Sequence, residues 1–137
     1  RDAMAFIKFA RDRNMEAKNL MFAEEINEKL QDYIFKKCKS FNNIGVLGVS
    51  FKPTSPVTIG SPSKMLIQDL LKSDKNVYTY DKLDETHDNL GLNTNACSTA
   101  QNCIDKSDVV VIMHPDKDFS NLNYQGKQVI DLWGINK

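Results

Sequence analysis

The sequence predicts an α/β fold, with a Rossmann-like parallel sheet flanked by helices and preceded by a long N-terminal helix. Two short segments carry most of this prediction. Residues 44–49 are an apolar run, and residues 108–113 are apolar on both faces of an extended chain, as strands in the middle of a parallel sheet are. Between them, apolar residues recur at helical spacing after Ser61. Strands that alternate with helices in this way are typical of α/β domains.

The first forty residues are predicted to be helical. Residues 3–10 form a first helix, which the polar residues 12–14 end. A second helix is predicted over Met15–Lys37, because apolar side chains recur there at spacings of three and four; they are Leu20, Ala23, Ile26, Leu30, Tyr33 and Ile34. This helix is longer than the usual length of about 10–14 residues, which favours a helix that links domains or packs against a partner. We therefore expect residues 1–40 and 41–137 to be separate domains.

The second half of the chain continues the alternation of strand and helix. Ser61 is predicted as the N-cap of a helix that begins at Pro62, because serine caps helices well and proline needs no hydrogen bond in the first turn. The remaining elements follow in chain order: a strand at 76–80, a polar irregular segment at 82–96, a short helix at 98–105 and a last strand at 128–132.

Composition excludes several classes of function. The 18 basic and 18 acidic residues balance, so the chain lacks the excess positive charge of nucleic-acid-binding proteins. No apolar run approaches the ~20 residues needed to cross a bilayer. The three cysteines are irregularly spaced and no signal peptide is visible, which predicts a reduced, cytoplasmic protein. His87 and His114 do not have the spacing of a metal site, and we expect none.

The candidate ligand site is the loop that follows the strand at 44–49. Lys52 lies between Phe51 and Pro53, at the carboxyl edge of the predicted sheet, where open α/β sheets bind ligands. Ser61 and Ser63 add hydrogen-bond donors at the start of the next helix, whose N-terminus favours negative charge. The arrangement predicts an anionic, phosphorylated ligand. A solvated loop lysine without a ligand explains Lys52 equally well on position alone.

The glycines of this segment do not form a dinucleotide-binding loop. Gly45 and Gly48 are predicted to lie inside the strand, and no further glycine occurs before Gly60, whereas the dinucleotide fingerprint needs three glycines in the turn. Close packing of the strand against a helix is therefore the favoured interpretation of both. After the central strand, His114 either lines the cleft or ends the strand. Trp133 is predicted to be a packing residue, with a place beside a nucleotide base as the alternative.

Several segments together resemble the UDP-glucose/GDP-mannose dehydrogenase family, over nearly the whole chain. They are Glu25-Ile26-Asn27-Glu28, Phe51-Lys52-Pro53, Ser61-Pro62-Ser63, Tyr80-Asp81, Asp108–Ile112 and Val129-Ile130-Asp131. The first is similar to a step in the family's long central helix, which forms the dimer. Arg1-Asp2 is similar to the end of the family's Gly-x-Cys-x-Pro-Lys-Asp segment, so the nucleophilic cysteine would precede this chain, which would be a fragment.

The resemblance implies an NAD-dependent nucleotide-sugar 6-dehydrogenase, which oxidises a sugar alcohol to a uronic acid in two steps and serves polysaccharide biosynthesis. This chain would be its C-terminal substrate-nucleotide-binding part, for UDP-glucose, UDP-N-acetylmannosamine or GDP-mannose. Asp2 would be the acid that assists catalysis. The NAD-binding domain would lie outside the chain, which alone should be inactive, and the Met15–Lys37 helix would form a homodimer. The residues that would contact substrate or cofactor are Phe51, Lys52, Ser61 and Ser63.

One loop departs from the family pattern. After Phe-Lys-Pro the family has Asp, Arg and Glu where this chain has Val57, Ile59 and Gly60, and isoleucine cannot replace a bidentate cation that helps to hold the cofactor. Two other hypotheses therefore stay open. One is a non-catalytic nucleotide-binding or regulatory module. The other is a dimerising fragment in which the long helix matters and the sheet edge has lost its ligand.

Overall fold

The structure is a computed structural model that describes residues 2–136, with side chains from residue 3 onward. The chain divides into two compact units between Tyr33 and Ile34. This division falls inside the helix Lys18–Cys38. The residues after the division belong to the second unit because Ile34 and Cys38 are fully buried in its hydrophobic core. The last turn of that helix therefore belongs with the sheet rather than with the helical residues before it.

The first unit is helical, as predicted. Helix α1 spans Asp2–Arg11 and helix α2 begins at Lys18 and ends at Cys38. The break predicted at residues 12–14 is confirmed, and Asn14 has a left-handed backbone with φ of 54°. Asparagine tolerates this conformation better than most residues. Helix α2 starts later than the predicted Met15, because residues 15–17 connect the two helices.

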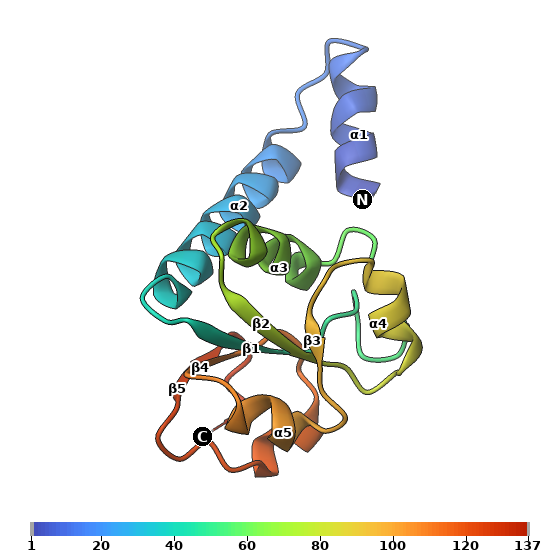
Figure 1. Ribbon diagram of the computed structural model, residues 1–137. Helices are drawn as coiled ribbons and strands as arrows, with labels where there is room; N and C mark the ends of the chain where they lie inside the picture. The colour runs from blue at the N-terminus through green and yellow to red at the C-terminus, as the bar shows by residue number, and fades with distance from the viewer. Residues whose placement is uncertain (1, 137) are drawn as a thin grey trace. The chain divides into compact units, whose positions relative to one another are not determined.

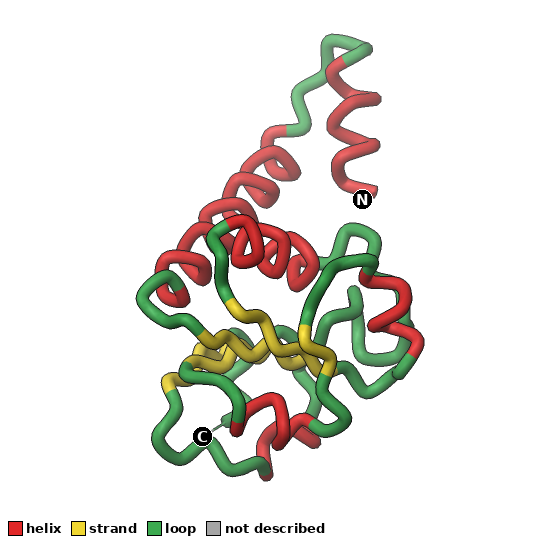
Figure 2. Tube along the Cα trace, in the orientation of Figure 1, coloured by secondary structure: helices red, strands yellow, loops and turns green. Residues whose placement is uncertain are grey.

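The second unit contains five parallel strands in the order β3-β2-β1-β4-β5 (Figures 1 and 2). The strands are β1 (Asn43–Leu47), β2 (Asn76–Tyr80), β3 (Asn95–Ala96), β4 (Val109–Ile112) and β5 (Gln128–Asp131). The register pairs Ile44 with Val77 on one side and with Val109 on the other. This confirms the predicted Rossmann-like α/β fold, and β4 is buried along its whole length as a central parallel strand should be.

Helices cover both faces of this sheet (Figure 1). On one face, Val46 and Val111 pack with the end of α2 and with α3 (Pro62–Lys72). On the other, Leu47 and Ile112 pack with α5 (Ala100–Asp105) and with a 3₁₀ helix, η1 (Lys117–Asn121). Alternate side chains of each strand enter opposite cores, because successive residues of a strand point to opposite faces.

Two local predictions were wrong. The segment 82–96 is not irregular throughout, because it contains helix α4 (Glu85–Leu90) and the short strand β3. In this helix Thr86 and Leu90 are buried, and Gly91, with φ of 64°, ends it. Gly48 lies just beyond β1 rather than inside it, because its φ of 86° takes it out of the extended conformation.

Candidate functional site

The site lies at the carboxyl ends of β1 and β4, where the sheet has its topological switch point. The connection after β1 runs through α3 on one face, whereas the connection into β4 runs through α5 on the other. In open α/β sheets the ligand crevice forms where the strand order reverses in this way. Because all the strands are parallel, the segments after β1, β4 and β5 lie at the same edge as those after β2 and β3.

Gly48 and His114 fit against each other at this edge. A Cβ atom on Gly48 would collide with Cγ of His114 and would lie 2.7 Å from its Cβ and Nδ1. His114 is buried, and its Nε2 lies 2.7 Å from the carbonyl oxygen of Ser50. The histidine therefore connects the segment that follows β4 (called the β4 exit below) to the loop after β1 (the β1 exit), and its ring fills the space beside Gly48. Gly45 is also a close-packing position, since its Cβ would meet the Ser107 hydroxyl at 2.5 Å and the sulfur of Cys103, in α5, at 3.3 Å. This agrees with the predicted packing of the strand against a helix for Gly45, whereas Gly48 packs against a residue that follows β4.

Asp81, the first residue after β2, holds the backbone of the loop after β1. Its Oδ2 accepts hydrogen bonds from the N–H groups of Val49 and Ser50, both at 2.8 Å, and its Oδ1 accepts one from Leu83 at 3.2 Å. The carboxylate is only 3% exposed. Burial alone would raise its pKa, but the backbone N–H groups of Ser50, Val49 and Leu83 outweigh it and hold the pKa below the ordinary value. Asp81 is therefore an ionised carboxylate at neutral pH.

This contact decides what the β1 exit can bind. In a dinucleotide-binding sheet the N–H groups of this turn point at a pyrophosphate. Here the corresponding amides of Val49 and Ser50 already have an anionic partner in Asp81. A phosphate would have to displace that carboxylate and would meet its negative charge. The sequence reasoning missed this role of Asp81, although an acidic residue directly after the second strand was a visible signal.

Ser61 and Ser63 anchor the start of α3 to the same loop. Ser61 Oγ donates to the carbonyl oxygen of Val49 at 2.8 Å, and Ser63 Oγ donates to that of Gly48 at 2.7 Å. Both side chains are buried. Ser61 is the N-cap residue and Pro62 opens the helix, as predicted, but the Ser61 hydroxyl makes no capping hydrogen bond to the helix. The Ser61 hydroxyl instead stabilises the loop after β1, through its hydrogen bond to the carbonyl oxygen of Val49.

Lys52 extends from a loop whose backbone is fixed. The Ser50 hydroxyl donates to the Lys52 carbonyl at 3.0 Å, and the N–H of Ser55 donates to the same oxygen at 3.1 Å. The N–H of Phe51 is bonded to the carbonyl oxygen of Val57 at 2.7 Å. The Lys52 and Phe51 side chains are both exposed. Lys52 makes no ion pair among residues 3–136, so its charge is available to an anion.

The positions that depart from the family pattern are exposed as well. Val57 is half-exposed and Ile59 is 67% exposed. Neither is needed for the core of this unit, and neither offers a charge. The loop after β1 therefore presents one cation, Lys52, among apolar side chains.

Trp133 lies at the same edge, after β5, and differs from the prediction of a packing residue. It is 55% exposed, and its ring N–H donates to the carbonyl oxygen of Met113 at 2.9 Å. The backbone N–H groups of Trp133 and Gly134 both donate to Asp131 Oδ1, at 3.0 and 2.9 Å. A tryptophan next to an apolar strand is usually buried; here the tight turn capped by Asp131 holds it at the surface.

A cleft of about 210 Å³ lies beside this edge, between the ends of β2 and η1. Lys82 and Asp118 form an ion pair of 2.6 Å at its mouth, and the rings of Tyr80 and Phe119 meet edge to face at its wall. The Asp118 hydrogen bond, the largest cause, and the nearby carboxylate of Asp116 raise the pKa of Lys82. No sequence pattern predicts this ion pair, because Lys82 and Asp118 are 36 positions apart in the chain.

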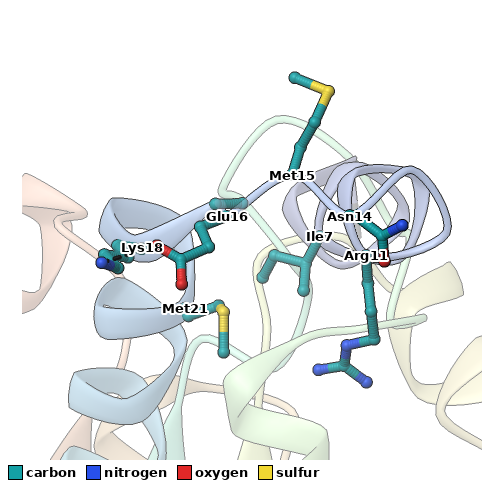
Figure 3. Close-up of a pocket in the computed structure, with 8 residues that line it drawn as sticks. Ile7, Arg11, Asn14, Met15, Glu16, Lys18 and Met21 are labelled. Atoms are coloured by element: carbon teal, nitrogen blue, oxygen red, sulfur yellow. Dashed lines mark ion pairs between the residues drawn. The ribbon is translucent and has the colours of Figure 1, made fainter.

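A larger hollow of about 410 Å³ lies in the first unit, where α1 and α2 are joined (Figure 3). Ile7 and Arg11 come from α1, whereas Met21 comes from α2, and Met15 points away from the hollow. Its ion pair, Glu16–Lys18 at 2.6 Å, is exposed to solvent on both sides. This hollow has the open, charged lining of a surface groove and lacks convergent buried polar groups, which ligand sites usually contain.

The remaining candidates are Asp2 and the three cysteines. Asp2 begins α1, but its side chain, like Arg1, lies outside the described residues. Cys97 and Cys103 are buried among apolar side chains, and burial raises the pKa of Cys103 far above its ordinary value. Burial likewise raises the pKa of Cys38 to about 12. Within residues 3–136 no cluster of acidic, histidine and cysteine side chains could hold a metal, and no helix is long and apolar enough to span a bilayer.

Comparison with known proteins identifies the sheet. Residues 45–137 match the model of the UDP-glucose/GDP-mannose dehydrogenase family, UDP binding domain. A search of curated protein sequences found no significant match. Two solved structures have the same fold and are much longer than this chain, which spans about a third of each.

The first is a UDP-glucose dehydrogenase from the hyperthermophilic archaeon Pyrobaculum islandicum. It is 24% identical with a TM-score of 0.80, and the match covers 95% of this chain and 32% of that one. The second is a GDP-mannose dehydrogenase from Pseudomonas aeruginosa in a ternary complex. It is 23% identical with a TM-score of 0.82, and the match covers 98% of this chain and 35% of that one. Because the family model matches residues 45–137, well over half of the sequence, the chain belongs to the UDP-glucose/GDP-mannose dehydrogenase family.

Proposed function

We propose that this chain is the C-terminal, substrate-nucleotide-binding part of an NAD-dependent nucleotide-sugar 6-dehydrogenase. The observation that carries the proposal is the exposed Lys52, which makes no ion pair among residues 3–136 and lies on a hydrogen-bonded loop near the switch point of a UDP binding domain. The ammonium group would lie beside the diphosphate of the substrate, and Phe51 would contact the nucleotide next to it. Membership of the family and the likeness to two dehydrogenases support this assignment.

Ser61, Ser63 and His114 prepare the loop for an anion in this proposal. Their side chains engage the carbonyl oxygens of Val49, Gly48 and Ser50 respectively. Each engaged carbonyl has its negative end turned toward a polar side chain, which lowers its repulsion of a phosphate nearby. The serines would thus act by positioning the loop that carries Lys52, and their oxygen atoms remain the predicted contacts of substrate or cofactor.

The residues present at the β1 exit do not fit the pyrophosphate of NAD. Asp81 occupies the N–H groups that would bind it, and the ring of His114 fills the space beside Gly48. We therefore place NAD in a part of the enzyme that precedes this chain, together with the nucleophilic cysteine that Asp2 would assist. The chemistry of oxidation belongs there, and this chain supplies affinity for the nucleotide.

The test is NADH formation by the full-length protein that contains this chain. UDP-glucose, UDP-N-acetylmannosamine and GDP-mannose are offered in parallel, and we expect two NADH per sugar with one of them. The 137-residue chain alone is expected to reduce no NAD. Absence of turnover with all three sugars in a folded protein would contradict the proposal, and NAD reduction by the chain alone would contradict the division of roles.

Replacing Lys52 by alanine is expected to weaken binding of UDP or GDP to this chain about tenfold or more, since a hydrogen bond to a charged group contributes about 1.5–3 kcal/mol. Isothermal titration calorimetry measures the affinity. Lys106→Ala is the matched control, because Lys106 is also exposed but precedes β4, at the opposite edge of the sheet. Equal losses in both variants would mean that Lys52 contributes only to the net charge.

A homodimer through α2 is the second part of the proposal. Phe22, Ile26 and Leu30 are spaced by four residues and are exposed, Phe22 by 63%. An apolar stripe of this kind marks an interaction surface. Sedimentation velocity is expected to show a dimer, and Phe22→Glu with Ile26→Glu is expected to weaken it at least tenfold. Glu28→Lys on the same helix is the control for charge, and a monomer at high concentration would contradict a dimer.

A non-catalytic nucleotide-binding module is the alternative. The exposed Ile59, at the position where the family has arginine, is the observation that favours it. It predicts that the chain binds nucleotide normally while the full-length protein forms no NADH.

A further inference from the structure

We propose that Trp133 is the platform on which the base of the bound nucleotide stacks. This inference rests on the nucleotide-binding function proposed above, and it names the residue that would recognise the base. It starts from the position of the ring. Trp133 follows β5 directly at the carboxyl edge of the sheet, and its ring N–H is bonded to Met113, the first residue after β4.

The backbone around Trp133 is anchored on both sides. Leu132 packs against the core shared with α3, and Ile135 packs against the core shared with α5. Asp131 closes the turn between them, since it accepts hydrogen bonds from the N–H groups of Trp133, Gly134 and Asn136 at 2.8–3.0 Å. The exposure of the tryptophan is therefore not the result of a loose chain end. The turn fixes an aromatic ring at the surface with its backbone already ordered.

The hydrogen bond of the ring engages one edge of it, and more than half of the residue remains exposed. The N–H edge is held by the Met113 carbonyl at 2.9 Å, while the side chain is 55% exposed. A ring held by one edge loses little conformational freedom when a planar group covers its face. Nucleobases are such groups, and every base has a face that can stack on an aromatic side chain.

Lys52 lies at the same edge of the sheet as Trp133, where it can bind the diphosphate of a nucleotide whose base stacks on Trp133. The β1 exit that carries Lys52 and the β5 exit that carries Trp133 are separated by one strand, β4. Two strand spacings separate the ends of β1 and β5 by about 10 Å, and Lys52 and Trp133 follow these ends by five and two residues. This spacing of the strand ends is comparable with the separation of base and diphosphate in an extended nucleotide. The region between them is the β4 exit, where the buried His114 and the Met113 carbonyl are already engaged. A nucleoside diphosphate can therefore lie across β4 with its phosphates at Lys52 and its base at Trp133.

The experiment uses the 137-residue chain, in which Trp133 is the only tryptophan. Its fluorescence therefore reports on this ring alone. UDP, GDP and inorganic pyrophosphate are titrated while the fluorescence and its quenching by acrylamide are recorded, and calorimetry measures binding of the same ligands independently. We expect UDP or GDP to quench the emission and to protect the ring from acrylamide, and pyrophosphate to do neither.

Two variants complete the test. Trp133→Leu is expected to weaken nucleotide binding about tenfold, as base stacking on aromatic side chains predicts, and to leave pyrophosphate binding unchanged. Trp133→Phe keeps an aromatic face and is expected to retain most of the affinity. Circular dichroism shows whether the variants fold, and the acrylamide measurement on the unmodified chain stands if they do not.

The outcomes separate the two proposals. In one outcome, calorimetry shows that UDP or GDP binds, but the ligand neither quenches Trp133 nor protects it from acrylamide, and Trp133→Leu loses no affinity. This outcome would overturn the stacking platform and leave the nucleotide-binding function intact. Equal quenching by pyrophosphate would also overturn the platform, because a base would not be required. Absence of nucleotide binding by calorimetry would overturn both.

Discussion

Replacing Asp81 by alanine is expected to destabilise the sheet unit by about 4 kcal/mol, because buried N–H groups left without partners cost about 1–3 kcal/mol each. The N–H groups of Val49 and Ser50 lose their 2.8 Å bonds to a carboxylate that is 3% exposed. In the described part of the chain, no other side chain accepts a hydrogen bond from these two amides. Urea denaturation of the purified chain measures the free energy of unfolding.

Asp108→Ala is the matched control for this prediction. Asp108 also accepts two hydrogen bonds, from the backbone and side-chain nitrogens of Asn43 at 3.0 and 3.1 Å, but it is exposed at the opposite edge of the sheet. Its loss is expected to cost about 1 kcal/mol, since water can replace the carboxylate there. Similar losses in the two variants would mean that the buried anion contributes no more than an ordinary hydrogen-bond acceptor.

The pH dependence of unfolding checks the same carboxylate. Because the pKa of Asp81 is lower in the folded than in the unfolded chain, the unfolded chain binds more protons between the two values. The stability from Asp81 is thus fully present above its ordinary pKa of about 3.9. It is lost as the pH falls through the folded pKa. Asp81→Asn is expected to flatten the acid side of the stability profile, and an unchanged slope would contradict the assignment.

Replacing Gly48 by alanine is expected to destabilise the sheet unit by about 3 kcal/mol. The left-handed backbone with φ of 86° costs a residue with a Cβ atom about 1–2 kcal/mol. The added methyl group would collide with the ring of His114, and overpacking of this kind costs about 1–3 kcal/mol more. The ring cannot move aside without breaking its 2.7 Å bond to the Ser50 carbonyl. Thermal and urea denaturation measure the loss.

Gly60 provides the control for the cost of a left-handed backbone conformation. Its φ is 74°, but a Cβ atom there would meet no atom within 4 Å. Gly60→Ala should therefore show the conformational cost alone, about 1 kcal/mol. A second check is the His114→Ala background, in which Gly48→Ala should cost less because the colliding ring is gone. If the two glycine variants lose equal stability, the contact with His114 carries no energy.

The sequence predicted the fold well wherever an apolar pattern was continuous. The strand at 76–80 was predicted with its observed bounds, and the central strand at 108–113 was placed within one residue of β4 at each end. Segment 82–96 was missed because its elements are short and polar, and the six-residue helix α4 is stabilised by tertiary contacts of Thr86 and Leu90 rather than by a long stripe. A pattern method has too few residues to detect such a helix.

The candidate site was predicted only in part. Lys52 could be placed at the carboxyl edge because it directly follows a recognisable strand. The acidic side chain of Asp81 after the second strand was visible in the sequence, but its partners were not, since its hydrogen bonds join residues 31 and 32 positions apart in the chain. Trp133 was expected to be a packing residue because it lies near the end of the last strand. Its exposure depends on the turn closed by Asp131, which is a matter of backbone geometry rather than of composition.

The contact of Asp81 with the loop after β1 has a consequence for the order of events in binding. In sheets that receive a phosphate at this turn, part of the free energy that orders the turn is gained only when the ligand arrives. Here the chain carries its own anion, so the same electrostatic energy is gained when the protein folds. The loop that presents Lys52 should consequently have one conformation in the free and the nucleotide-bound chain, with equal protection of the Val49 and Ser50 amides from hydrogen exchange.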